Sequence, residues 1–202
     1  MDYSLASRHN CGSTLRIYFR YVYDNGIIGK DISVFVLKDN YNHHSKIPTT
    51  YDEDEIRRII ASVERSSATG KRDYLILLLA AEYGWRSSDI INFRFSQIDW
   101  DKNVIRFSQH KTDIPVEYPL LSSIGNAIID YLKHGRPITD SDEIIVSAES
   151  AKKSHPLSSP TVHSIVTKYM RKADINNWKC KKHGPHSLRH YGESFKMVSD
   201  CA

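Results

Sequence analysis

The sequence predicts an α+β fold that is mainly α-helical with a small antiparallel β-sheet. Apolar residues recur at helical spacing on both sides of a short central region, residues 104–118, where they alternate as in strands. Residues 74–83 are apolar nearly all round, which is typical of a helix buried at the centre of a domain. No strand–helix–strand alternation occurs, so a Rossmann-type domain is not supported.

The first predicted helix follows Ser13 and ends at Asn25-Gly26, a typical helix stop. A short apolar stretch at residues 32–37 comes next, and then a polar segment with turn-forming residues. One and a half helices bury too little surface to form a core. We therefore expect residues 1–40 to be the end of a larger domain, residues 41–49 to be a linker, and residues 50–202 to form a second domain.

Helix boundaries are predicted in the second domain by capping residues. Thr50 and Glu53 have the spacing of a capping box, which indicates a helix start. The central buried helix is expected to end at Gly84, and Ser87 or Ser88 to cap the next helix.

Two strands and two further helices complete the predicted elements. Residues 104–107 and 114–118 alternate as short strands around a turn at residues 110–113. Helical spacing then returns over residues 121–132 and again over residues 162–170.

Composition excludes several classes of protein. The chain has 202 residues, 40% apolar and 26% charged, which is typical of a soluble globular protein rather than a disordered one. No apolar run approaches the ~20 residues that a helix needs to cross a bilayer. Three scattered cysteines are too few for a disulfide framework and favour a reducing, cytoplasmic location.

Charge is unevenly distributed along the chain. The net charge of +4 combines +7 in residues 151–202 with −3 in the first 150 residues. Five of the ten histidines also lie in the basic segment. A basic C-terminal quarter indicates a polyanionic partner, nucleic acid first and an acidic membrane second.

Four residues that can carry positive charge stand at the ends of predicted elements. Arg86 follows the glycine that closes the buried helix, Lys111 lies in the turn between the strands, and a His-x-x-Arg motif places His186 before Arg189. This order, with Asp89 three residues after the first arginine, resembles the motifs of the tyrosine recombinase (phage integrase) family. The lysine comes 25 residues after the first arginine, and the histidine 75 residues after the lysine. The resemblance covers most of the chain.

The resemblance implies a fold like the catalytic domain of these recombinases, incomplete at its C-terminus, and a partner that is double-stranded DNA. Family members break and rejoin DNA through a phosphotyrosine. Arg86 and Arg189 would clamp the scissile phosphate, because guanidinium groups bind its oxygens through paired hydrogen bonds. His186 would be the general acid/base and Lys111 the general acid, while Asp89 would orient the site. Arginines supply the positive charge, so neither a metal nor a cofactor is expected.

The resemblance fails near the C-terminus. The family's nucleophile is a tyrosine well downstream of the second arginine, but only 13 residues follow Arg189 here. Tyr191 lies beside Arg189, outside the context of that nucleophile. We therefore expect a chain truncated at both ends, with residues 1–40 left from a DNA-clamping domain, that is inactive alone in strand cleavage. A monomer is expected, because family members dock on one another through C-terminal helices.

Two other interpretations stay open. The cationic residues could hold phosphates in a DNA-binding module without catalysis. Cys180, His183, His186 and His190 could in principle bind zinc, although their spacing fits no common zinc module and the flanking lysines would repel a cation. His190 is given no catalytic role.

Overall fold

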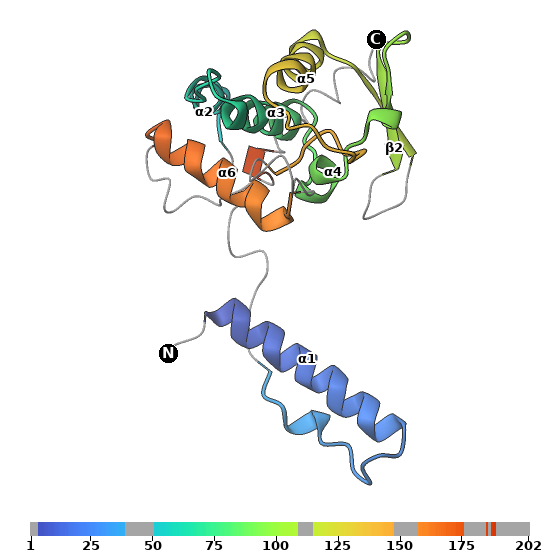
Figure 1. Cartoon of the computed structure of the whole chain (residues 1–202). Coiled ribbons are helices and arrows are strands. Elements are labelled where there is room, and N and C mark those ends of the chain that lie inside the picture. The colour runs from blue at the N-terminus through green and yellow to red at the C-terminus, as the bar shows by residue number, and fades with distance from the viewer. Residues whose placement is uncertain are drawn as a thin grey trace, which may run out of the picture. The chain divides into compact units, whose positions relative to one another are not determined.

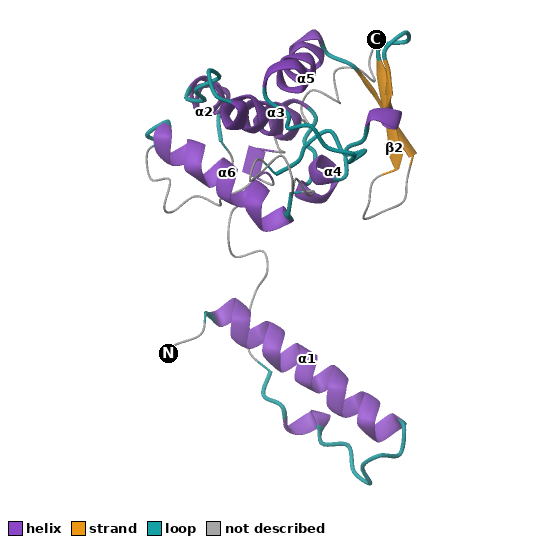
Figure 2. Cartoon of the chain, viewed as in Figure 1, coloured by secondary structure: helices purple, strands orange, loops and turns teal. Residues whose placement is uncertain are grey.

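The computed structural model describes residues 4–38, 51–108, 115–147 and 157–175, together with Pro185, Ser187 and Leu188. The chain forms two compact units, Met1–Ile47 and Pro48–Ala202. Helices dominate the described ranges, and the strands form one small sheet (Figure 2). The predicted mainly helical α+β fold is confirmed. The predicted linker at residues 41–49 lies outside the described residues.

The first unit contains α1 (Leu5–Asp24) and the short 3-10 helix η1 (Ser33–Phe35). α1 begins well before the predicted start at Ser13, because the hydroxyl of Ser4 caps it by accepting a hydrogen bond from the amide of Ser7. The helix ends before Gly26, as predicted. Among the described residues of this unit, only Val22 and Ser33 are buried.

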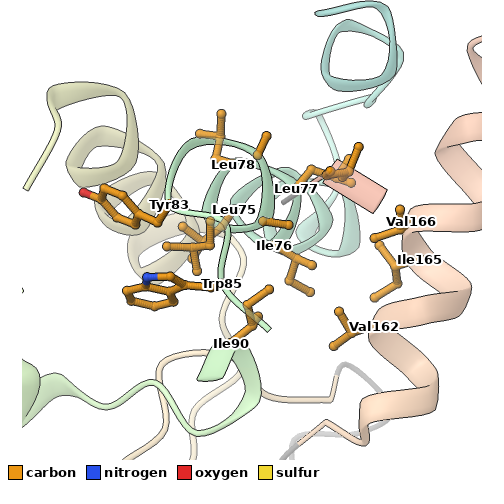
Figure 3. Close-up of a cluster of buried hydrophobic side chains, with 14 of the residues drawn as sticks. Leu75, Ile76, Leu77, Leu78, Tyr83, Trp85, Ile90, Val162, Ile165 and Val166 are labelled. Carbon is orange, nitrogen blue, oxygen red and sulfur yellow. The ribbon is translucent and has the colours of Figure 1, made fainter. Parts of the chain in front are cut away.

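The second unit is organised around α3 (Ala68–Glu82), which contacts α2 (Glu53–Ala61), α4 (Ser87–Ile91), α5 (Ser122–His134) and α6 (Ser159–Lys172) (Figure 1). Residues 75–81 of α3 are buried on all sides, as their composition predicts. Figure 3 shows Ile76 of α3 in the same apolar cluster as Val162 and Ile165 of α6. Full burial of one such large apolar side chain contributes about 1.5–3 kcal/mol, so this helix makes a large contribution to the stability of the unit.

The start of α2 differs from the prediction. Asp52, not Thr50, is the capping residue: its carboxylate accepts the amide hydrogen of Glu55 at 2.7 Å, and the carboxylate of Glu55 accepts the amide hydrogen of Asp52 at 3.1 Å. The predicted pairing of Thr50 with Glu53 is therefore wrong by two residues. Both pairs have the same spacing, and aspartate caps a helix as well as threonine does.

The sheet has three antiparallel strands in the order β1 (Ile98–Asp99), β2 (Val104–Ser108) and β3 (Pro115–Pro119). The two longer strands confirm the predicted pair, with Ile105 opposite Tyr118. β1 was not expected, because two residues are too few to show an alternating pattern. The predicted turn at residues 110–113, together with Ile114, lies outside the described residues. None of the helices in the described ranges is long and apolar enough to cross a membrane.

Candidate functional site

Arg86 lies in the turn directly after the end of the central helix, α3. α3 is closed by Gly84, whose φ of 64° lies in the left-handed region that favours glycine. The chain then turns, and the amide of Trp85 donates to the carbonyl oxygen of Leu79 at 3.4 Å. Arg86 follows with extended backbone angles and is half-buried. The turn is thus fixed to the best-buried helix of the unit.

Asp89 holds the backbone of this turn. Its carboxylate is 6% exposed and accepts the amide hydrogen of Arg86 at 3.3 Å. Arg86 therefore occupies the cap position of α4, and the expectation that Ser87 or Ser88 would cap this helix is wrong. The reason is that an acid three residues into a helix can itself satisfy the amide of the cap residue. Asp89 lies where it could orient the arginine, which stays a prediction.

Trp85 ties the turn to the sheet through aromatic packing. Its ring centroid lies 5.4 Å from that of Tyr83, 4.9 Å from that of Phe93 and 5.8 Å from that of Tyr118 in β3. Tyr83 and Trp85 lie together at the end of the core cluster in Figure 3. Such contacts add about 0.5–1.5 kcal/mol per pair beyond the burial of area.

The hydroxyl of Tyr83 makes a second link. It donates to the carbonyl oxygen of Pro119 at 2.6 Å and accepts the amide hydrogen of Leu121 at 3.1 Å. Burial raises the pKa of Tyr83 to about 12, so the hydroxyl keeps its proton at neutral pH. The sequence analysis did not identify this residue. The feature that could have identified it is a tyrosine directly before the glycine that ends an apolar helix.

The other predicted site residues, Lys111, His186 and Arg189, lie outside the described residues. So do Tyr191 and the proposed zinc ligands Cys180, His183 and His190. Their immediate neighbours are partly described: β2 and β3 flank the segment that contains Lys111, and Leu188, between His186 and Arg189, is 1% exposed. Within the described ranges, no group of three His, Cys, Asp or Glu side chains is placed to hold a metal.

The outward side of α6 forms a shallow, open hollow that the sequence prediction did not single out. Its described lining is polar and cationic and comes entirely from this helix: Ser159, Pro160, His163, Ser164, Thr167, Lys168 and Arg171. The opposite side of α6 packs into the core. The feature of the sequence that could have predicted this surface is the set of polar residues between the apolar positions of residues 162–170, which lie on the opposite side of the helix.

Comparison with known proteins decides the family. Residues 49–197 match the profile described as the Phage integrase family. The chain belongs to this family. A relative of this integrase-family chain, the integrase/recombinase y4gC of Sinorhizobium fredii, is 34% identical over 145 residues, or 71% of this chain and 72% of y4gC. The tyrosine recombinase XerA of Pyrococcus furiosus is 32% identical over 148 residues, or 71% of this chain and 46% of XerA.

Solved structures agree on the fold. The XerH site-specific recombinase bound to its difH substrate superposes with a TM-score of 0.70 at 18% identity, covering 98% of this chain and 56% of XerH. A lambda integrase (75-356) dimer bound to a COC′ core site gives a TM-score of 0.66 at 22% identity, covering 94% of this chain and 66% of the integrase chain. The integrase-family chain spans less than two thirds of the length of XerA, XerH and the lambda integrase chain.

Proposed function

We propose that this chain takes part in the site-specific breaking and rejoining of double-stranded DNA, the reaction of DNA integration and recombination. The family match carries the proposal, because its range, residues 49–197, contains Arg86, Lys111, His186 and Arg189. The relatives are named as integrases and recombinases, and the solved neighbours are bound to a COC′ core site or to difH. We expect the protein to act in the cytoplasm, where its DNA would be.

In this proposal Arg86 and Arg189 bind the scissile phosphate. A phosphodiester under attack gathers negative charge on its non-bridging oxygens, and each preorganised donor stabilises this charge by about 3–4 kcal/mol. Burial is consistent with a common site, because Ile90, four residues after Arg86, and Leu188, directly before Arg189, both belong to the one hydrophobic core of the unit. The guanidinium groups supply the positive charge, and no metal ion or cofactor enters the proposal.

Lys111 and His186 would move the protons. A histidine near its ordinary pKa can accept and return the proton of a nucleophile, which accelerates such reactions by about 10²–10⁴. A lysine between β2 and β3 could protonate the departing 5′ oxygen. The described ends of these strands, Ser108 and Pro115, face each other and support a hairpin that carries this lysine.

α6 would be the helix that contacts DNA. His163, Thr167 and Arg171 follow one another at intervals of four residues along its exposed side, within the hollow described above. A single α-helix fits the major groove, where hydroxyl, imidazole and guanidinium groups can meet base edges or phosphates. The side chains of α6 are thus of the kind that DNA binding requires.

The domain organisation is also proposed. Residues 1–40 would be the C-terminal part of a helical DNA-clamping domain, residues 41–49 a linker, and residues 50–202 a catalytic domain. The scarcity of buried side chains in the first unit supports this, since its apolar residues need a further partner to cover them. The lambda integrase structures are of a dimer and a tetramer on DNA, whereas we expect this chain to be a monomer without DNA.

Salt-dependent DNA binding tests the proposal first. Fluorescence anisotropy with a labelled 30-base-pair duplex should give a dissociation constant in the micromolar range or weaker, and a log–log salt slope of about 0.9 per neutralised phosphate. Arg86→Gln should lower the slope by about 0.9. Arg57→Gln is the matched control, because Arg57 is exposed on α2 and paired with Glu53. Binding that does not respond to salt would contradict the proposal.

Adduct formation tests catalysis itself. A polypeptide of this sequence, incubated with a nicked suicide duplex selected for binding, should form no denaturant-resistant protein–DNA adduct. The phosphate site alone does nothing, because the reaction needs an oxygen nucleophile in line with the leaving group. An adduct that Tyr191→Phe abolishes would identify Tyr191 as the nucleophile and contradict this expectation. DNA binding without an adduct, and without any effect of Arg86→Gln, would favour a simple DNA-binding module.

A further inference from the structure

A buried charged cluster joins α3 to α6. Asp73 of α3 is 1% exposed, and its Oδ1 accepts two hydrogen bonds from the guanidinium of Arg72, at 3.2 and 2.9 Å. Its Oδ2 accepts from the hydroxyl of Tyr169 at 3.0 Å and from Nζ of Lys168 at 3.3 Å. The carboxylate therefore has partners on both oxygens, and two of the donors come from α6.

Lys168 belongs both to this cluster and to the outward side of α6. Its side chain is 56% exposed and lines the hollow together with Thr167 and Arg171. Its ammonium nevertheless bends back over the ring of Tyr169, 4.6 Å from the ring centroid, to reach Asp73. Burial lowers the pKa of Lys168, but the Tyr169 hydroxyl and the Asp73 carboxylate outweigh it, and the pKa is raised overall.

The ion pair is costly to open. If Lys168 moved to a DNA phosphate, the carboxylate of Asp73 would stay buried and keep two partners, the guanidinium of Arg72 and the hydroxyl of Tyr169. This loss is unfavourable, because the carboxylate is 1% exposed and its Oδ2 would give up a charge-assisted hydrogen bond and keep only that from Tyr169. A phosphate on the outside of α6 offers Lys168 only a solvent-exposed contact in return.

We propose that Asp73 is a positioning residue, which withholds Lys168 from DNA phosphates so that α6 meets DNA through its other polar side chains. The inference rests on the proposed function, in which α6 contacts DNA. Phosphate contacts supply sequence-independent affinity, whereas contacts with base edges supply specificity. Each lysine withheld from the backbone therefore lowers the affinity for every sequence by the same factor, makes binding less dependent on salt, and leaves the ratio of affinities between sequences to the other side chains of α6.

The salt slope of binding to an arbitrary 30-base-pair duplex measures whether Lys168 is withheld. In Asp73→Asn, Lys168 is released and should add about 0.9 to the slope, so that a fourfold rise in salt costs about 3.5-fold more affinity than in the parent. Adding Lys168→Gln to this variant should restore the parent slope. Adding Lys102→Gln instead gives the same net charge at the distant β1–β2 turn and should leave the steeper slope.

A second comparison leaves the buried groups of α3 unchanged, which matters because Asp73→Asn could fail to fold once Arg72 loses its acid. In the parent background, Lys168→Gln should leave the slope unchanged, whereas Arg171→Gln on the same helix should lower it by about 0.9. Circular dichroism and thermal unfolding check the fold of each variant.

Two results would overturn the inference: a lower slope in Lys168→Gln, or a parent slope in a folded Asp73→Asn. A parent protein with no salt-dependent binding would instead remove the proposed function, and the inference would fall with it.

Discussion

Replacing Tyr83 by phenylalanine removes one hydroxyl and keeps the aromatic packing around the Arg86 turn. That hydroxyl bridges the carbonyl oxygen of Pro119, at 2.6 Å, and the amide of Leu121, at 3.1 Å. A hydrogen bond contributes about 0.5–1.5 kcal/mol net, and an unpaired buried partner costs about 1–3 kcal/mol. Because both bonds are only partly buried, we expect Tyr83→Phe to lower the free energy of unfolding by about 2 kcal/mol.

Urea denaturation measures this loss, and the denaturant slope should not change. Tyr131→Phe is the matched control: Tyr131 is as well buried, but its hydroxyl accepts one long hydrogen bond, from the amide of Val146 at 3.5 Å, so its loss should stay below about 1 kcal/mol. Hydrogen exchange at the Leu121 amide should also accelerate in Tyr83→Phe alone. Equal losses in the two variants, or unchanged exchange at Leu121, would refute the reasoning.

Two further predictions concern packing and pH. A Cβ at Gly70 would lie 1.7 Å from the carbonyl oxygen of Glu64, so Gly70→Ala should lower the free energy of unfolding by about 2–3 kcal/mol in thermal unfolding despite the better helix propensity of alanine. Gly125→Ala, whose Cβ would meet only a leucine side chain at 3.7 Å, should cost nothing. Burial raises the pKa of Tyr51 and of Tyr83 to about 12, against about 10 in the unfolded chain. The unfolded chain then loses these protons first, so the contribution of both groups to stability is complete below about pH 10 and is lost as the pH rises toward 12. Urea unfolding at about pH 9 and pH 11 should show this loss, and an equal loss in Tyr51→Phe and the parent would contradict it.

The fold could be predicted where the pattern is local. The apolar run at residues 74–83 required a buried helix, and the alternation at residues 104–118 required a pair of strands, because each pattern suits one geometry. The capping residue of α2 was harder to predict, because Asp52 and Thr50 both lie three residues before a glutamate. Which of the two caps the helix depends on where the helix begins in the folded protein. β1 pairs only two residues with β2, too few for any periodic signal.

The candidate site could be predicted only in part. Arg86 was singled out because a glycine, an arginine and an acid follow the end of a helix within a few residues of each other, and its role in a site stays a prediction. Tyr83 and Asp73 were missed because their partners are distant in the sequence: Pro119 for the first, and Lys168 for the second. No spacing rule connects such positions, and only the packing of α3 against its neighbours brings them together.

α3 is joined to a different part of the unit at each of its ends. Near its start, Asp73 holds Lys168 of α6, and just beyond its close, Tyr83 fixes the end of β3. These two residues are about 15 Å apart along a helix that rises 1.5 Å per residue. Residues 75–81 between them are buried on all sides, so α3 cannot slide or rotate without opening the close-packed core. α4, which starts at the Arg86 turn, also packs directly against α6, so the position of this turn relative to α6 is fixed by α3 and α4 together. In the proposed function Arg86 binds the scissile phosphate and α6 binds a groove of the same duplex. The fixed position of Arg86 relative to α6 would then determine which base pairs α6 contacts.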